Sequence, residues 1–300
     1  MNFPQFGYIS LPLDKGNISL FERILAILDK EMTEPTLYGW FHLMCLSIVI
    51  GLCILVVLKC RRFTQKQVRL TLGITVSVMI AFEIYKQLNF SYSPSTDTWS
   101  YRWYVFPYQF CSTPMYVIPA VLLMKNEKIQ KSLYAYLATY ALFAGIGVML
   151  YPSTVFISTI GINIQTMVHH GAMVVIGVFM YATGTVKIEH KTILRAVPVF
   201  AILSSIAIIA NVLFEVLGDS SQTFDMFFIS PFEEPSLPGL SIIFADSPYP
   251  LYLCGYLFGF TAAGYLMVLL AMLSVKLNAR VQARKVAFEQ TKTNEVKETL

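Results

Sequence analysis

Seven long apolar segments constrain the fold of this chain more than any other feature. A helix needs about 20 mostly apolar residues to cross the hydrocarbon core of a bilayer. Seven segments come close to this length, namely residues 39–58, 68–88, 107–124, 133–150, 160–184, 193–217 and 250–275. Hydrophobic residues make up 56% of the chain and charged residues only 13%, which is far more apolar than a soluble domain. The sequence therefore predicts an all-α, polytopic membrane bundle with seven transmembrane helices.

The two ends of the chain differ from this apolar region. Residues 1–38 carry several charges and no apolar core of the signal-peptide type. Within them, residues 19–31 place apolar side chains at helical spacing, which predicts a short amphipathic helix in an outer N-terminal segment. Residues 39–276 form the predicted transmembrane domain, and residues 277–300 form a charged cytoplasmic tail.

Basic residues predict the orientation of the bundle. They concentrate in alternate loops, and the outer loop 218–249 contains no Lys or Arg at all. The positive-inside rule places the basic loops in the cytoplasm, so we expect the N-terminus outside, the C-terminus inside, and the protein in the plasma membrane. The residues concerned are Lys59, Arg61, Arg62, Lys66 and Arg69, then Lys125, Lys128 and Lys131, then Lys187, Lys191 and Arg195, and finally Lys276, Arg280, Arg284 and Lys285.

Polar side chains inside the predicted spans gather in the outer half of the bundle. At about 1.5 Å per residue, Glu83, Cys111 and Asn211 lie within one or two helical turns of each other. Gln165 is at a similar depth, and His169 and His170 are somewhat deeper. Polar groups in lipid are costly and usually face the bundle interior or a water-filled cavity. Their shared depth predicts one polar chamber.

Each of these side chains also has a structural interpretation. Glu83 and Lys86 are spaced to form an ion pair that neutralises itself, and the alternative is that Glu83 handles a proton or binds the substrate in the chamber. Asn211 could simply tie two helices together. A lone intramembrane cysteine is more often a small packing residue than a nucleophile. His169 and His170 are about 100° apart on a helix, so we expect only one of them to face the chamber.

The chemistry that such a chamber could support is nucleophilic acyl transfer. The segment 107–114, Pro-Tyr-Gln-Phe-Cys-Ser-Thr-Pro, places a thiol, an amide and two hydroxyls at the start of an apolar span. A thiol needs a base beside it to become a thiolate, and one of the two histidines could supply it. The amides of Gln109, Gln165 or Asn211 could donate hydrogen bonds to the oxyanion. We expect the substrate to be an acyl lipid of the surrounding membrane.

Two short motifs resemble a known family of membrane proteins. Phe106-Pro107-Tyr108-Gln109-Phe110-Cys111, followed by Met167-Val168-His169-His170-Gly171, resembles the signatures of YwaF-type integral membrane proteins, relatives of the eukaryotic transmembrane protein 164. Asn211 and the run 247–252 before the last span add to the resemblance, which extends over about residues 35–275. The eukaryotic branch implies a cysteine acyltransferase acting on phospholipids. Carried over, this gives Cys111 as nucleophile and His170 as base, with His169 in reserve. The chain departs from the bacterial pattern at Gln109, where that pattern has His.

Other functional classes stay open at this point. A seven-helix transporter or a small-ligand sensor would use the polar chamber without covalent chemistry. The sequence shows neither a Gly-rich phosphate loop nor a basic patch interleaved with aromatic residues, so we expect no nucleic-acid partner. The five cysteines are scattered at unrelated spacings, and we predict no metal site, disulfide framework or cofactor.

Overall fold

The computed structural model of this chain describes residues 19–93, 96, 98–218, 221–237, 239–244 and 246–298. It is built almost wholly of helices, with one small two-stranded antiparallel sheet at one end. The helices are α1 (Leu20–Leu28), α2 (Trp40–Lys59), α3 (Gln65–Ser91), α4 (Pro114–Leu123), α5 (Glu127–Tyr136), α6 (Leu142–Leu150), α7 (Ile160–Ala182), α8 (Lys191–Leu217), α9 (Leu240–Ile243) and α10 (Tyr249–Glu298). The strands are β1 (Tyr92–Ser93) and β2 (Thr98–Trp99), and the short turns are η1 (Trp103–Val105), η2 (Phe110–Ser112), the π-helical η3 (Leu137–Ala141) and η4 (Met226–Phe228).

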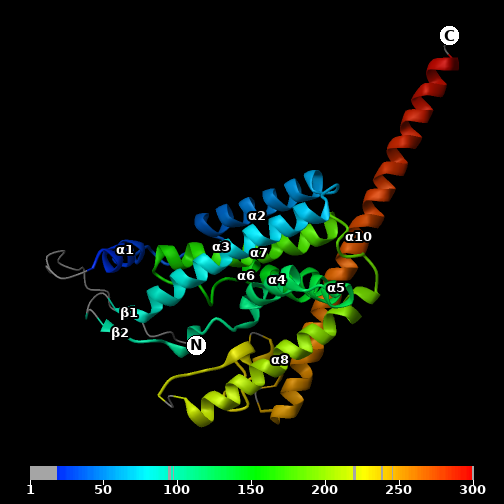
Figure 1. The fold of residues 1–300 in the computed structure, drawn as a ribbon. Coiled ribbons are helices and arrows are strands. Elements are labelled where there is room, and N and C mark those ends of the chain that lie inside the picture. Colours follow the sequence, from blue (N-terminus) through cyan, green and yellow to red (C-terminus); the bar gives the residue numbers. More distant parts are fainter. Residues whose placement is uncertain are drawn as a thin grey trace.

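Six helical stretches in the described residues are long and apolar enough to cross a membrane, and they confirm the all-α polytopic bundle. Together with the shorter α4 they lie in roughly three layers, with α2, α3 and α7 on one side, α4, α5 and α6 in the middle, and α8 and α10 on the other (Figure 1). Helix α10 runs on well beyond the bundle. The α5–α6 stretch and α7 form the core, because 67% and 72% of their most apolar windows are buried, against 11% for α2.

The third predicted span, 107–124, does not form one continuous helix, so the prediction of seven spanning helices is not confirmed. Its helical part, Phe110–Leu123, is shorter than a span, and α4 itself rises only about 15 Å, half of a bilayer core of about 30 Å. Pro107 and Pro114 favour this break, because a proline lacks the N–H that a helix interior needs and fits best in the first turn. Pro114 indeed begins α4. The chain before it, residues 103–113, is an irregular segment with two 3₁₀ turns.

The predicted amphipathic helix in the N-terminal segment is present as α1. Ser19 and Glu22 form a capping box: the Ser19 hydroxyl accepts from the Glu22 N–H, and the Glu22 carboxylate accepts from the Ser19 N–H. This arrangement satisfies backbone groups that have no partner within a helix. Asn89, near the end of α3, donates to the Asp29 carboxylate at 3.1 Å, which fixes the end of α1 to the bundle.

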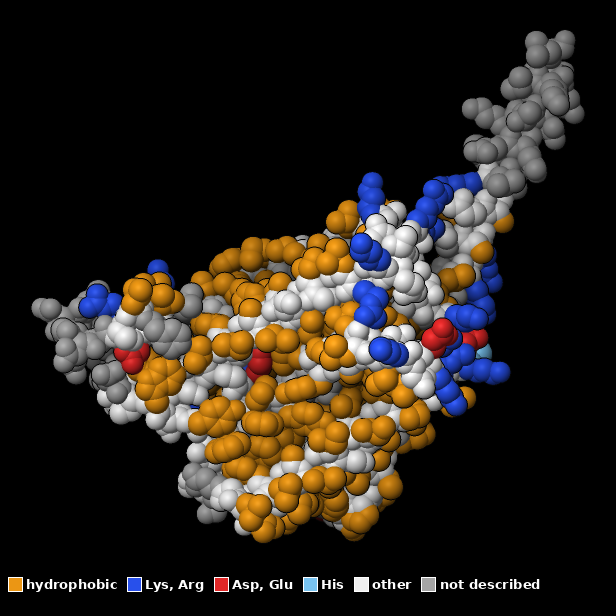
Figure 2. Space-filling model, in the orientation of Figure 1, with side chains coloured by type: hydrophobic (Ala, Val, Ile, Leu, Met, Phe, Trp, Pro, Cys, Tyr) orange, Lys and Arg blue, Asp and Glu red, His pale blue; other side chains and the backbone are white. Residues whose placement is uncertain are grey.

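The surface of the molecule separates basic from apolar residues. Figure 2 shows most Lys and Arg side chains at the end where α10 leaves the bundle, a few at the opposite end, and hydrophobic side chains covering much of the surface between them. The loops α2–α3, α4–α5 and α7–α8 all lie at this end (Figure 1), as the alternation of basic loops in the sequence requires. An apolar girdle of this kind is what a bilayer would cover.

Close packing between α6 and α7 gives a test of the fold. A methyl group added at Gly145 would lie 2.8 Å from the Met173 Cβ and 2.9 Å from the His170 carbonyl oxygen, so the backbones would have to separate. We expect Gly145→Ala to lower the free energy of unfolding by about 1–3 kcal/mol, the usual effect of overpacking. Thermal unfolding in detergent is the measurement. Gly147→Ala on the same helix is the control, since nothing lies within 4 Å of the added methyl. Equal melting temperatures for the two variants would contradict this packing.

Candidate functional site

The predicted nucleophile, Cys111, lies in the irregular segment that precedes α4. Its 3₁₀ turn is held by backbone bonds from Ser112 N–H to the Gln109 carbonyl, 2.8 Å, and from Thr113 N–H to the Phe110 carbonyl, 3.3 Å. Non-helical backbone at membrane depth is tolerated only where protein buries it. The surrounding helices do so here, and their polar side chains bind several of its carbonyl groups.

His169 on α7 is the histidine that contacts Cys111. Its Nε2 lies 3.0 Å from the Cys111 carbonyl oxygen, and its side chain is only 3% exposed. A carbonyl oxygen can only accept, so Nε2 carries the hydrogen, and in the neutral ring Nδ1 is left with its lone pair. Among the described residues, this Nδ1 has no hydrogen-bond partner. The ring is therefore buried against the backbone of Cys111, and one of its nitrogens is a hydrogen-bond acceptor without a partner among the described residues.

His170 is bound to its own helix. Its Nδ1 lies 2.8 Å from the Thr166 carbonyl oxygen one turn earlier, and its ring centroid lies 5.5 Å from that of His169. The two rings therefore face in different directions, His169 toward the backbone of Cys111 and His170 toward the Thr166 carbonyl of its own helix. Geometry thus favours His169, rather than His170, as the partner of Cys111.

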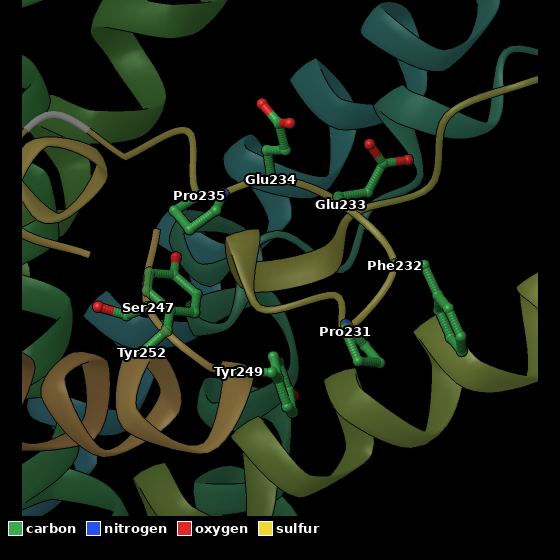
Figure 3. Close-up of a pocket in the computed structure, with 8 residues that line it drawn as sticks. All are labelled: Pro231, Phe232, Glu233, Glu234, Pro235, Ser247, Tyr249 and Tyr252. Carbon is green, nitrogen blue, oxygen red and sulfur yellow. The ribbon is translucent and has the colours of Figure 1, made fainter. Parts of the chain in front are cut away.

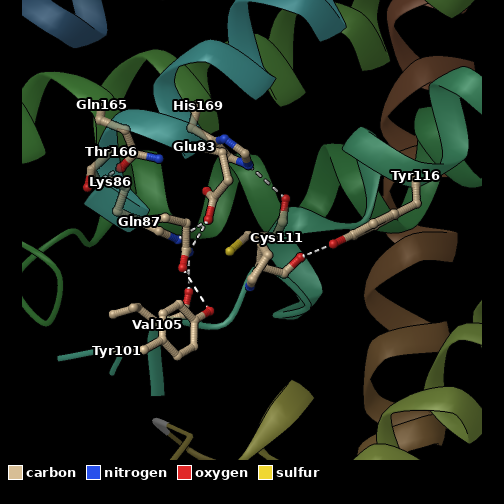
Figure 4. A network of polar contacts seen from close by, with 11 residues as sticks. Glu83, Lys86, Gln87, Tyr101, Val105, Cys111, Tyr116, Gln165, Thr166 and His169 are labelled. Atoms are coloured by element: carbon tan, nitrogen blue, oxygen red, sulfur yellow. Dashed lines mark hydrogen bonds and ion pairs between the residues drawn. The ribbon is translucent and has the colours of Figure 1, made fainter. Parts of the chain in front are cut away.

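Glu83 on α3 lies at the same site, within a small polar cluster (Figure 4). Its Oε1 forms an ion pair with the Lys86 ammonium at 2.8 Å and accepts a hydrogen bond from the Gln87 amide at 2.7 Å. The same amide donates to the Val105 carbonyl at 2.6 Å, and the Tyr101 hydroxyl donates to Gln87 at 2.9 Å. The predicted Glu83–Lys86 ion pair is confirmed. Gln87 and Tyr101 were not predicted from the sequence, although Gln87 is one helical turn after Glu83.

Depth along the helices brings these groups together as the sequence predicts. Glu83 is eight residues from the end of α3 at Ser91, and His169 is nine residues from the start of α7 at Ile160. At about 1.5 Å per residue both lie roughly 12–14 Å below the end of the bundle that is opposite the basic one. Cys111 is within electrostatic range of both Glu83 and Lys86.

Gln109 and Asn211 bind a different segment, the turn η4. The Gln109 amide donates to the Asp225 carbonyl at 3.0 Å and accepts from the Phe227 N–H at 3.1 Å. Asn211 binds both backbone groups of Met226, at 3.1 and 2.8 Å. These two side chains hold a strained turn, because Phe227 has a φ of 64° that non-glycine residues rarely adopt. Their predicted role as oxyanion donors stays a prediction.

Gln165 is also buried, one turn before His169 on α7. Its side-chain oxygen lies 3.5 Å from the Thr166 hydroxyl. Because residues four apart share a face of a helix, Gln165 and His169 are directed to the same side of α7. Figure 4 shows the Gln165 side chain near Lys86. Within the ranges that the structure describes, no three His, Cys, Asp or Glu side chains converge as a metal site would require.

A hollow lies on the loop between α8 and α10, and Cys111 is not among the residues that line it. It has a volume of ≈ 310 Å³ and is lined by the turn 231–235 on one side and by Ser247, Tyr249 and Tyr252 on the other (Figure 3). The Tyr249 hydroxyl donates to the Ile229 carbonyl at 3.0 Å, and the Tyr252 hydroxyl to the Phe228 carbonyl at 2.5 Å. These tyrosines fasten the same loop that Gln109 and Asn211 hold from the other side.

Comparison with known proteins supplies one match. A family model described as the TMEM164 family matches residues 37–270, which is more than half of the chain and includes every predicted site residue. No curated protein and no solved structure matches the chain.

The hydrogen bonds from Asn211 to η4 predict that removing this side chain lowers the stability of the protein. Asn211→Ala would leave the buried N–H and carbonyl of Met226 without these partners, and an unsatisfied buried group costs about 1–3 kcal/mol. We expect a lower melting temperature and faster proteolysis within residues 221–237. Ser205→Ala is the matched control on α8, because the exposed Ser205 hydroxyl only bonds its own helix at Ala201. Equal melting temperatures and equal cleavage rates for Asn211→Ala and Ser205→Ala would show that contacts other than those of Asn211 hold the turn.

Asp225, in the same loop, predicts a dependence of stability on pH. It is 8% exposed, and burial raises the pKa of its carboxyl from 3.8 to about 7, with Glu233 nearby adding to the effect and the backbone N–H groups of Ser230 and Ile229 opposing it. The folded state therefore keeps a proton that the unfolded state loses, so stability falls as pH rises from about 4 to about 7. Asp225→Asn should flatten this slope in melting temperatures measured from pH 4 to 8, whereas Asp246→Asn, an exposed carboxylate of the same loop, should leave it unchanged. An equal slope in all three proteins would assign the pH dependence to other groups.

Proposed function

The chain belongs to the TMEM164 family, and from this premise we propose that it is a lipid acyltransferase or acyl hydrolase of the membrane that uses Cys111 as its nucleophile. The family and the six long apolar helices make it a multi-pass membrane protein. The eukaryotic relatives that its motifs resemble imply a Cys–His pair acting on phospholipids. The proposal assigns that pair to side chains of this chain.

One observation supports the proposal most strongly, namely the bond between His169 Nε2 and the Cys111 carbonyl oxygen at 3.0 Å. It holds the imidazole against the residue that carries the thiol and leaves Nδ1 as a free acceptor. We therefore take His169 as the base, in place of His170, which the family resemblance suggested. A base of this kind is required because the thiolate, not the thiol, is the nucleophile.

The proposed reaction begins with transfer of the Cys111 proton to His169 Nδ1. The sulfur then attacks the carbonyl carbon of an ester in a membrane lipid, the ester C–O bond breaks, and the leaving oxygen takes the proton from His169. Gln165, on the same face of α7, is the amide that we assign to the oxyanion. Gln109 and Asn211 are already bonded to η4, so in this scheme they shape the site from behind Cys111.

The proposed orientation follows from the basic end of the molecule. We take this end as cytoplasmic, which places the C-terminus inside, the N-terminus outside, and the site in the outer half of the plasma membrane. This orientation requires residues 103–123, part irregular and part helix, to complete a seventh crossing. Acyl chains in the bilayer would then reach the site sideways, between helices.

Loss of the acyl–enzyme adduct in Cys111→Ala tests the proposal. The full chain in nanodiscs of phosphatidylcholine with an alkyne-tagged acyl chain should acquire a label that hydroxylamine removes, as it removes a thioester. We expect no label above background in Cys111→Ala and full labelling in Cys254→Ala, which removes an exposed thiol of α10. The melting temperatures of both variants establish that they are folded. Undiminished labelling of folded Cys111→Ala would refute the proposal.

A further inference from the structure

Two buried atoms at the site are hydrogen-bond acceptors without a donor. They are Nδ1 of His169 and Oε2 of Glu83, which have no partner among the residues that the structure describes. The side chains are 3% and 6% exposed, so bulk water does not satisfy them. An unsatisfied buried acceptor costs free energy, and two on neighbouring helices at one site indicate a ligand that supplies donors.

The two oxygens of Glu83 differ in their surroundings. Oε1 accepts from both Lys86 and Gln87, so the ion pair and the amide leave Oε2 unoccupied. The Lys86 ammonium already balances the charge of the buried Glu83 carboxylate. Oε2 therefore has no further role in charge neutralisation. A Glu83 that served only as the partner of Lys86 would have no reason to keep a second oxygen buried and directed into the site.

Oε2 belongs to the side-chain cluster that also contains the proposed nucleophile. In Figure 4 the Glu83 carboxylate, the His169 ring and the Cys111 sulfur are drawn in the same polar cluster. Glu83 is also within electrostatic range of Cys111. Two acceptors beside a nucleophile suit a ligand with an O–H group, because such a group can donate to one of them while its oxygen approaches the reacting carbon.

We propose that Glu83 is a second catalytic proton acceptor, which binds the hydroxyl group that takes the acyl chain from Cys111. This inference rests on the proposed function and adds the second half of the reaction to it. The ligand class is a hydroxyl compound, either water or an alcohol such as the free hydroxyl of a lysolipid. His169 serves the formation of the thioester, and Glu83 serves its removal.

The second half-reaction balances without any further reactant. The hydroxyl oxygen forms a bond to the thioester carbonyl carbon, and its proton passes to the Glu83 carboxylate. The C–S bond breaks, and the Cys111 thiolate leaves. The proton then moves from Glu83 to this thiolate, which restores both side chains. The products are the new ester, or the free fatty acid when water is the hydroxyl compound.

Partition between the two half-reactions tests this role. Full-length chain in nanodiscs is loaded with alkyne-tagged phosphatidylcholine and then chased with untagged lipid, with or without lysophosphatidylcholine. We expect Glu83→Gln to form the hydroxylamine-sensitive adduct to the wild-type level but to lose it about 100-fold more slowly, a typical contribution of a positioned base. Glutamine keeps the shape of Glu83 and an oxygen that can accept from Gln87, but it loses the ion pair with Lys86 and does not take up a proton. Glu83→Asp, which retains a carboxylate, should recover part of the rate.

Lys86→Gln is the matched control, because it breaks the same ion pair from the other side. If Glu83 only neutralises Lys86, both variants will change adduct formation and adduct loss alike, and the inference is wrong. Adduct loss at the wild-type rate in folded Glu83→Gln also overturns it. Absence of any adduct in the wild type, or its persistence in Cys111→Ala, refutes the proposed function itself and the inference with it. If Glu83→Gln loses the adduct more slowly than the wild type without lysophosphatidylcholine, the protein is a hydrolase. If the loss is slower only when lysophosphatidylcholine is present, it is a transferase. Both results support Glu83 as the proton acceptor of the second half-reaction.

Discussion

The structure depends on satisfying the irregular backbone of residues 103–113 inside an apolar bundle. In a helix, the backbone carbonyl groups accept from N–H groups of the same helix. Several carbonyl groups of residues 103–113 have no such backbone partner. Polar side chains from the neighbouring helices supply the missing donors. The pairs are Gln87 with the Val105 carbonyl, Tyr116 with the Pro107 carbonyl, and His169 with the Cys111 carbonyl. Most of the polar chamber therefore has a structural reason to exist before any chemistry is considered.

This requirement helps to separate the groups that hold the fold from those that remain for chemistry. Oε1 of Glu83, Nε2 of His169 and the amides of Gln109 and Asn211 are all bonded to protein atoms. Atoms on the same side chains that have no such bond are Oε2 and Nδ1. A purely structural cluster gains nothing from leaving acceptors unpaired in a low-dielectric interior, where each one is costly. The functional proposals use these remaining atoms and the thiol beside them.

Much of the fold could be predicted from the sequence, because the length and composition of an apolar segment set its ability to span a bilayer. Depth counting also placed Glu83 and Cys111 at a similar level, with His169 somewhat deeper, since the rise of a helix is fixed. The third span was different: its composition is apolar throughout, and only Pro107 and Pro114 signal that the backbone leaves the helix. The bonds of Gln109 and Asn211 could not be predicted, because their partner is an irregular turn whose path depends on tertiary contacts.

The choice between the two histidines shows what residue spacing alone leaves open. Adjacent helical residues point about 100° apart, which indicates that one of them faces the site but not which one. The structure decides through the backbone groups available to each ring: the Thr166 carbonyl of its own helix for His170, and the Cys111 carbonyl of another segment for His169. Such a carbonyl is free only because the chain around Cys111 is not helical. The same break that shortens the third span thus exposes the carbonyl that binds His169 Nε2, and it leaves Nδ1 as the nitrogen to which we assign the proton of Cys111.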